Sequence, residues 1–212
     1  MQKLVLASQK GGVGKTTLAL HLAVAAELAG AGPVVMLDMD PQGSLAAVWN
    51  QRAAERPAMA RTSVVDIHAT LDDLAADGFN LVVIDTPPAI TNTISTVLRL
   101  ADLVLVPTRP SPVDLGSIGA TLDMIEQTGN QPFYFVINGA KPKARLVMQT
   151  LIALAQHGKV AGTIYDRVDF PTAMIDGRTA CELDPNGKAS VEINALWSVV
   201  RDNLIKQKES AR

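Results

Sequence analysis

Residues 8–17 read Ser-Gln-Lys-Gly-Gly-Val-Gly-Lys-Thr-Thr, and this stretch decides the fold of the chain. Glycine has no Cβ, so the three glycines let the backbone curl and direct successive N–H groups at a phosphate. An apolar run at 4–7 precedes the stretch, and a run with few helix breakers at 18–23 follows it. We therefore expect a strand, a phosphate-binding turn and a helix whose positive end faces the same phosphate.

The side chains at the end of this stretch have the chemistry of a nucleotide site. Lys15 is placed to reach the β- and γ-phosphates, and the Thr16 hydroxyl is placed to bind Mg²⁺. The usual motif, G-x-x-x-x-G-K-[ST], has glycine where this chain has Gln9, and it specifies no lysine where this chain has Lys10. The residues expected to contact the nucleotide are Gly11, Gly12, Val13, Gly14, Lys15, Thr16 and Thr17.

With Lys10 included, the loop resembles the deviant phosphate loop of the ParA/MinD-type ATPases, which include partition and Min-system ATPases. The plainer alternative is a glycine-rich turn with two solvated lysines, and it requires the spacing, the threonine pair and the strand–helix context to coincide. The resemblance covers essentially the whole chain and is closest to the small plasmid-type ParA partition ATPases. It implies ATP and Mg²⁺ as cofactors and one deviant Walker ATPase domain over residues 1–212.

Two acidic turns follow apolar strands, at the edge where open α/β sheets bind ligands. Asp38 and Asp40 follow the run at 34–37, and Asp85 ends the run at 81–84. An isolated Asp-x-Asp pair is usually a solvated turn. Beside a phosphate loop, the first turn, continued as Pro-Gln-Gly, resembles switch I of the family. The second has the form of a Walker B element, and its continuation Thr-Pro-Pro resembles switch II.

The resemblance also implies a role for each of these side chains. Phosphoryl transfer to water depends on positioning and on charge stabilisation, which Lys15 and the loop amides would provide. Thr16 and Asp85 are expected to organise the Mg²⁺, with Asp38 supporting the metal shell. Asp40 is expected to orient or polarise the attacking water.

Two further residues gain a role through the resemblance. Lys10 is expected to cross the interface of a face-to-face, ATP-dependent homodimer and to contact the partner's nucleotide. Asn138 follows the apolar run at 133–137, and its amide is expected to read adenine because an amide both donates and accepts. The proline-rich loop at 107–114 is either close to the nucleotide and the dimer partner or a stiff connector.

Composition limits the remaining possibilities. The chain has 212 residues and a formal net charge of −2, which excludes a globally basic nucleic-acid binder but leaves room for a local basic patch. The single Cys181 excludes an internal disulfide and agrees with a reducing compartment. Neither a secretory signal nor an apolar run of about 18 residues is found, so we expect a cytoplasmic protein.

Short apolar runs alternate with helical stretches along the chain, which predicts an α/β fold with a twisted, mainly parallel sheet and helices on both faces. About seven or eight strands are expected, including a short one at 62–65, and 181–189 is expected to be a loop. No second ligand stands at helical spacing from any of the three histidines. We therefore interpret His21, His68 and His157 as ordinary helix residues.

The function that this resemblance implies is an ATP-dependent dimerisation switch and weak Mg-ATPase. It would position or segregate DNA or another intracellular cargo, associate with the nucleoid, and respond to a ParB-type adaptor or centromere-binding protein. The ATP dimer would bind DNA without sequence preference. A metabolic P-loop ligase of the dethiobiotin synthetase or cobyric-acid type is one alternative, and a Min-type membrane-associated ATPase is another.

Two surface predictions remain. An amphipathic stretch at 191–205 is expected to pack on the core, because its polar side lacks the basic excess that favours anionic lipid. The local DNA patch is expected to draw on Lys141, Lys143, Arg145 and Arg167, with Arg178 and Lys188 as further contributors.

Overall fold

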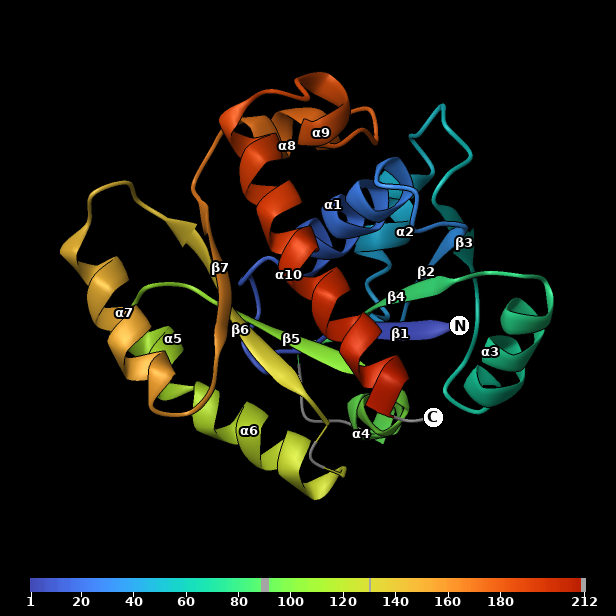
Figure 1. The fold of residues 1–212 in the computed structure, drawn as a ribbon, viewed down its shortest axis with the longest axis horizontal. Coiled ribbons are helices and arrows are strands. Elements are labelled where there is room, and N and C mark those ends of the chain that lie inside the picture. The colour runs from blue at the N-terminus through green and yellow to red at the C-terminus, as the bar shows by residue number, and fades with distance from the viewer. Residues whose placement is uncertain (89–91, 130, 211–212) are drawn as a thin grey trace.

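The computed structural model of the chain describes residues 1–88, 92–129 and 131–210. In this part of the chain, seven parallel strands form one sheet in the order β3-β2-β4-β1-β5-β6-β7, with helices on both faces (Figure 1). The strands are β1 (Gln2–Leu6), β2 (Val34–Asp38), β3 (Ala58–Ala60), β4 (Leu81–Asp85), β5 (Leu103–Thr108), β6 (Phe133–Ala140) and β7 (Val160–Tyr165). The helices are α1 (Lys15–Leu28), α2 (Ser44–Trp49), α3 (Ile67–Ala76), α4 (Asn92–Leu100), α5 (Pro112–Gly116), α6 (Ile118–Gln127), α7 (Arg145–Ala155), α8 (Asp169–Met174), α9 (Ala180–Leu183) and α10 (Lys188–Ser210). The predicted α/β class with a parallel sheet is confirmed.

Two hydrophobic layers enclose the sheet, because successive side chains of a strand point to opposite faces. Leu4 and Leu6 pack on one face with α1 and α10, and Val5 and Ala7 pack on the other face with α3, α4 and α6. All four side chains are fully buried. Burial on both faces explains why the central strands read as continuous apolar runs and not as alternating ones.

Helix α10 packs along β7 and α1 and covers one face of the sheet (Figure 1). Five of its apolar side chains are at most 3% exposed: Ile193, Leu196, Trp197, Val200 and Leu204. The prediction that this stretch belongs to the core is therefore confirmed. Among the described residues, no helix has both the length and the apolar character needed to cross a bilayer.

Two local predictions were wrong. The edge strand is β3 and not the run at 62–65, because Met59 and its neighbours pair with β2 while Ser63 hydrogen-bonds to Asp66 ahead of α3. The expected loop at 181–189 contains the end of α9 and the start of α10. Thr179 and Glu182 form a capping box that starts α9, which is a side-chain signal for a helix that was overlooked.

The carboxyl ends of the central strands meet at one edge of the sheet. In the strand register, Asp85 lies beside Leu6 on one side and beside Asp38 on the other. The phosphate loop leaves the sheet at the end of β1, between β4 and β5. The fold thus brings together the loop and both acidic turns, which are far apart in the sequence.

Candidate nucleotide site

The phosphate loop joins β1 to α1 and depends on glycine at two positions. Gly12 and Gly14 have φ angles of 74° and 94°, which side chains rarely tolerate. Gly14 also lies against Asn138, because a Cβ at this position would be 2.1 Å from Asn138 Nδ2. The backbone of Gly14 then starts α1, whose N-terminal end faces the loop.

Lys15 is buried beneath the loop. Its ammonium group donates to the backbone oxygen of Ser8, 3.3 Å away. Burial lowers the pKa of Lys15, and the negative charges of Asp85 and Asp40 partly oppose that shift. A desolvated ammonium group at this point is suited to an anion, which would restore the electrostatic partners that it lost on leaving water.

Asp85 is a deeply buried carboxyl group at the end of β4. Its side chain is 1% exposed, and its Oδ2 accepts from Thr16 Oγ1 at 2.5 Å. In the described part of the chain, its Oδ1 is buried without a hydrogen-bond partner. Burial raises the pKa of Asp85 to about 7, with Asp38 adding to the effect and the Thr16 hydrogen bond opposing it.

A divalent cation fits this carboxylate, because the unpartnered oxygen has capacity for one ligand bond. The described residues contain no group of three His, Cys, Asp or Glu side chains that could hold a metal ion. Mg²⁺ is usually bound by one or two protein ligands together with water and phosphate oxygens. The pair of Thr16 and Asp85 therefore suits a cation that arrives with a nucleotide.

The first acidic turn is organised by its own carboxylates. Asp38 accepts from the backbone N–H of Asp40 at 3.1 Å and from that of Ala46 at 3.0 Å. Asp40 in turn accepts from the N–H of Gln42 at 3.0 Å. Gly43 adopts a left-handed conformation, with φ 64°, and α2 starts directly after it. Asp38 thus fixes the turn that presents the half-buried Asp40.

The remaining predicted residues lie around the same loop. Asn138 donates from Nδ2 to the backbone oxygen of Val13 at 2.7 Å, and therefore contacts the loop from the end of β6. Lys10 is exposed at the loop surface. Pro88 is exposed and lies beside the loop, where a Cβ on Gly11 would approach it to 3.6 Å. The continuation of the predicted switch II, at 89–91, lies outside the described residues.

The structure also contains a pocket near the start of α1 that was not predicted from the sequence. Thr17, Phe170, Pro171, Met174 and Ile175 line a pocket of about 420 Å³ between the start of α1 and α8. The available signal was the pair Phe170 and Met174, two apolar residues four positions apart, which is the spacing of one side of a helix.

The basic residues that the sequence suggested for DNA binding differ in whether they already form an ion pair. Arg167 is ion-paired with Glu192 at 2.5 Å, and Arg178 with Asp176 at 2.7 Å. The side chains without such a pair in the described part of the chain are exposed: Lys141, Lys143, Arg145 and Lys188.

Comparisons with known proteins agree with this geometry. Residues 4–180 match the model of the CobQ/CobB/MinD/ParA nucleotide binding domain. The chain is 28% identical to the maintenance of carboxysome distribution protein A of Halothiobacillus neapolitanus over 207 residues, which cover 93% of this chain and 95% of that protein. It is 29% identical to the chromosome-partitioning ATPase Soj of Thermus thermophilus, over 96% of this chain and 82% of that protein.

Solved structures share the fold. A plasmid partition protein of Borrelia burgdorferi bound to AMPPNP superposes with a TM-score of 0.73 and 20% identity, over 95% of this chain and 98% of that one. A chain of the MinC:MinD cell division protein complex of Aquifex aeolicus superposes with a TM-score of 0.79 and 16% identity, over 95% of this chain and 96% of that one.

Proposed function

Because this chain belongs to the CobQ/CobB/MinD/ParA family of nucleotide-binding domains, we propose that it is an ATP-driven dimerisation switch that positions an intracellular cargo. The chain is an ATPase of the ParA/Soj type. The observation that carries the proposal is the buried Asp85, which accepts from Thr16 of the loop and has a second oxygen without a partner in the described part of the chain. The proposal treats residues 1–212 as one ATPase domain.

In this proposal, each site residue has a separate role in ATP hydrolysis. The loop amides and Lys15 bind the phosphates, and Asp40 orients the water whose oxygen bonds to the γ-phosphorus as the bond to ADP breaks. Thr16 and Asp85 would hold Mg²⁺, with Asp38 in its outer shell, and the bound ion would neutralise phosphate charge. Asp38 holds the turn of Asp40 through backbone hydrogen bonds, which supports this division.

The nucleotide base is assigned to the side of the loop formed by β6 and α8. The Nδ2 of Asn138 is committed to Val13, so the carbonyl oxygen of that amide is the atom we expect to accept from the adenine amino group. The apolar pocket lined by Thr17, Phe170 and Pro171 is large enough for a ring or a ribose.

Dimerisation rests on Lys10. Its side chain is exposed, whereas Lys15 fills the position beneath its own loop. An exposed ammonium group at the edge of an anion site can reach a nucleotide held by a second copy, in the manner of a residue that acts in trans. ATP bound between two copies would then hold the dimer together.

The cargo is assigned by class only. Related chains are named for the distribution of carboxysomes and for the partitioning of chromosomes, which supports a positioning role driven by an adaptor. Membrane association is disfavoured, because the apolar side of α10 is buried in the core. A metabolic ligase would instead require a small carboxylate substrate for turnover, and this requirement separates the two functions.

The proposal predicts binding to arbitrary duplex DNA that depends on ATP. Contact with phosphates alone makes log K fall by about 0.9 per log unit of salt for each phosphate neutralised. The matched variants are a triple substitution at Lys141, Lys143 and Arg145, and a double substitution at Arg167 and Arg178. The triple variant should lose affinity and salt dependence, and the double variant should keep most of both, because its arginines are already ion-paired.

The measurement is a titration of labelled duplex with ATP, ADP and no nucleotide at two salt concentrations. Lys10→Ala should abolish the part of the DNA binding that depends on ATP. Equal binding under all three conditions, or no binding under any, would exclude a nucleotide-driven DNA switch.

A further inference from the structure

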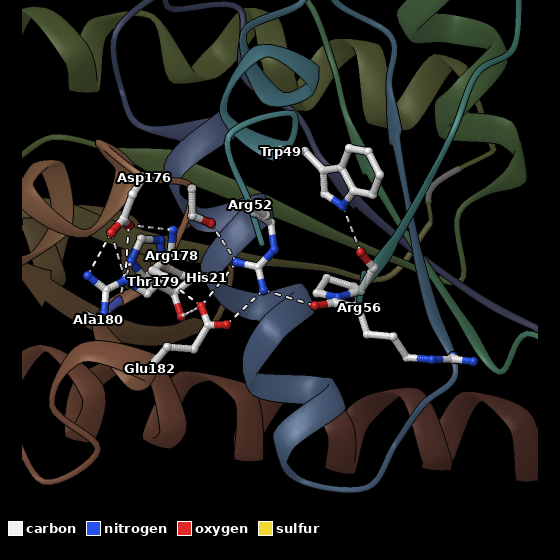
Figure 2. A network of polar contacts seen from close by, with 11 residues as sticks. His21, Trp49, Arg52, Arg56, Asp176, Arg178, Thr179, Ala180 and Glu182 are labelled. Atoms are coloured by element: carbon white, nitrogen blue, oxygen red, sulfur yellow. Dashed lines mark hydrogen bonds and ion pairs between the residues drawn. The ribbon is translucent and has the colours of Figure 1, made fainter. Parts of the chain in front are cut away.

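Arg52 is a buried arginine that lies away from the proposed reacting groups and follows α2. Its guanidinium group is 1% exposed and joins three segments of the chain (Figure 2). It donates from Nη1 to the backbone oxygen of Gly177 at 2.6 Å, from Nη2 to that of Arg56 at 2.9 Å, and from both nitrogens to Glu182 at 3.1 and 2.8 Å. A buried charge held this closely fixes the relative positions of its partners, because loss of any contact leaves a desolvated group unpaired.

Glu182 extends the contact into α9. Its carboxylate also accepts from the backbone N–H of Thr179 at 2.8 Å and from the Thr179 hydroxyl at 3.0 Å. Burial raises the pKa of Glu182, but the hydrogen bonds and charge of Arg52 and the bonds from Thr179 outweigh it, so the net pKa is lowered. The carboxylate is therefore charged, and it is shared between Arg52 and the first turn of α9.

Gly177 shows how tightly this contact is packed. Its φ is 76°, and a Cβ at this position would lie 2.6 Å from both the backbone nitrogen and the Cγ of Arg52. The turn between α8 and α9 thus rests directly on the chain that leaves α2.

The contacts described so far continue as a chain of hydrogen bonds, here called the polar path, from α9 to Thr17 at the end of the phosphate loop. The backbone N–H of Ala180 donates to His21 Nε2 at 3.1 Å, so Nε2 carries no proton and Nδ1 donates to the backbone oxygen of Thr17 at 2.8 Å. His21 is fully buried, and burial lowers its pKa to about 4, which agrees with a neutral ring. The ring also meets Phe170 edge to face, with a centroid separation of 5.0 Å.

At its other end the path reaches the first acidic turn. The N–H of Arg52 donates to the backbone oxygen of Trp49, the last residue of α2, and the first turn of α2 is held by Asp38 through Ala46. Both ends of the path therefore lie in the nucleotide site, at Thr17 and at Asp38. The path passes through α2, Arg52, Glu182, α9 and His21.

We propose that Arg52 is a positioning residue for ATP hydrolysis, which fixes α2 against α9 and thereby holds the turn that presents Asp40. The inference rests on the proposed role of Asp40. Within the described part of the chain, the hydrogen bonds of the Arg52 side chain go to Gly177, Arg56 and Glu182 and to no residue assigned to the phosphates. Its loss should therefore change the chemical step and leave nucleotide binding in place. Misalignment of a group by about 1 Å is enough to cost about 100-fold in rate.

The test separates kcat from nucleotide affinity. Arg52→Gln should lower kcat by about tenfold to 100-fold, while the Kd for ATP stays within about threefold of wild type. Arg52→Lys should recover part of the rate, because one ammonium group can reach Glu182 but cannot hold Gly177 and Arg56 with it. Asp102→Asn is the control: it breaks the Lys3–Asp102 ion pair at the amino end of β1, and kcat should be unchanged.

A second variant addresses stability. The double substitution Arg52→Met with Glu182→Met replaces the ion pair with apolar groups that fold well in such positions. It should restore the unfolding midpoint lost in Arg52→Gln and still show the low kcat. Recovery of kcat together with stability would overturn the inference, as would a normal kcat in Arg52→Gln. Measurement of kcat for Asp40→Ala in the same assay tests the proposed function independently of Arg52. Normal turnover by Asp40→Ala would remove the catalytic assignment of Asp40, whatever the result for Arg52.

Discussion

Asp85 and Arg52 each carry an ionisable side chain that is almost fully buried, but the two side chains differ in their hydrogen bonding. The Nη atoms of Arg52 make four hydrogen bonds to three segments, and of its nitrogens only Nε lacks a partner in the described residues. Among the described residues, the side chain of Asp85 accepts one hydrogen bond, from Thr16, and its other oxygen is buried without one. A satisfied buried charge fastens elements of the fold together, whereas an unsatisfied one has capacity for a ligand. Each prediction below tests that distinction.

Removal of the partner of the satisfied charge should have the largest effect. Glu182→Ala leaves Arg52 buried and unpaired, and should lower the free energy of unfolding by about 3–5 kcal/mol. Urea denaturation followed by circular dichroism measures the change. The double methionine variant is the matched control and should lose much less, because it leaves no isolated charge, although it also gives up the capping bonds between Glu182 and Thr179. Equal loss in both variants would mean that packing and not charge pairing holds α9.

The next effect is a pH dependence at His21, which faces Glu182 and Arg52 as well as Thr17. Its folded pKa of about 4 is below the ordinary value of 6.5. Between these values the unfolded chain binds the proton and the folded chain does not, so stability falls as the pH is lowered from 6.5 to 4. The shift corresponds to a loss on the order of 3 kcal/mol.

Asp85 titrates in the opposite sense, because its folded pKa of about 7 lies above the ordinary 3.8 and favours the folded state as the pH falls. The measurement is therefore made in an Asp85→Asn background. His21→Leu should flatten the stability profile between pH 4 and 6.5, and an unchanged profile would show that His21 is not the titrating group.

Lys15 should have a large effect on binding and little on folding. Lys15→Ala removes the charged donor to the phosphates, and ATP affinity should fall by at least about 100-fold. Asp40→Ala is the matched control, which should retain ATP and lose turnover. On both variants, calorimetric titration measures the affinity for ATP and a phosphate-release assay measures turnover. Normal turnover by Asp40→Ala would contradict the assignment of the water.

Asp85→Asn should have the smallest effect and the opposite sign. Without nucleotide, at pH 8, this change removes a buried and poorly satisfied charge and should stabilise the protein by on the order of 2 kcal/mol. The same variant should lose Mg²⁺-dependent ATPase activity. A destabilised Asp85→Asn protein would show that the carboxylate is already satisfied and carries no ligand capacity.

The sequence predicted the parts of this molecule that depend on neighbours along the chain. The phosphate loop, the strand that ends in Asp85 and the turn after Asp38 are each specified by a short run of consecutive residues, so spacing and residue type were sufficient. The apolar runs also specified the α/β class, because residues buried on both faces of a sheet leave a continuous signal. The burial of α10 was indicated by the helical spacing of its apolar residues and by a polar side without basic excess.

The parts that were missed depend on distant contacts. Arg52 and Glu182 are 130 positions apart, and His21 is 159 positions from Ala180, so no local pattern connects them. The edge strand was misplaced because the β-branched residues at 62–65 gave a stronger local signal than Ala58–Ala60. Pairing with β2 outweighed that local preference.

The most direct test of an ATP-driven switch is the mass of the particle in solution. Sedimentation equilibrium of Asp40→Ala, which should hold ATP without hydrolysing it, is measured with Mg-ATP, with Mg-ADP and without nucleotide. We predict a dimer with ATP alone, a monomer in the other two conditions, and a monomer throughout when Lys10→Ala is added. A monomer with saturating ATP, or a dimer whatever the nucleotide, would contradict the proposal that ATP joins two copies of this chain.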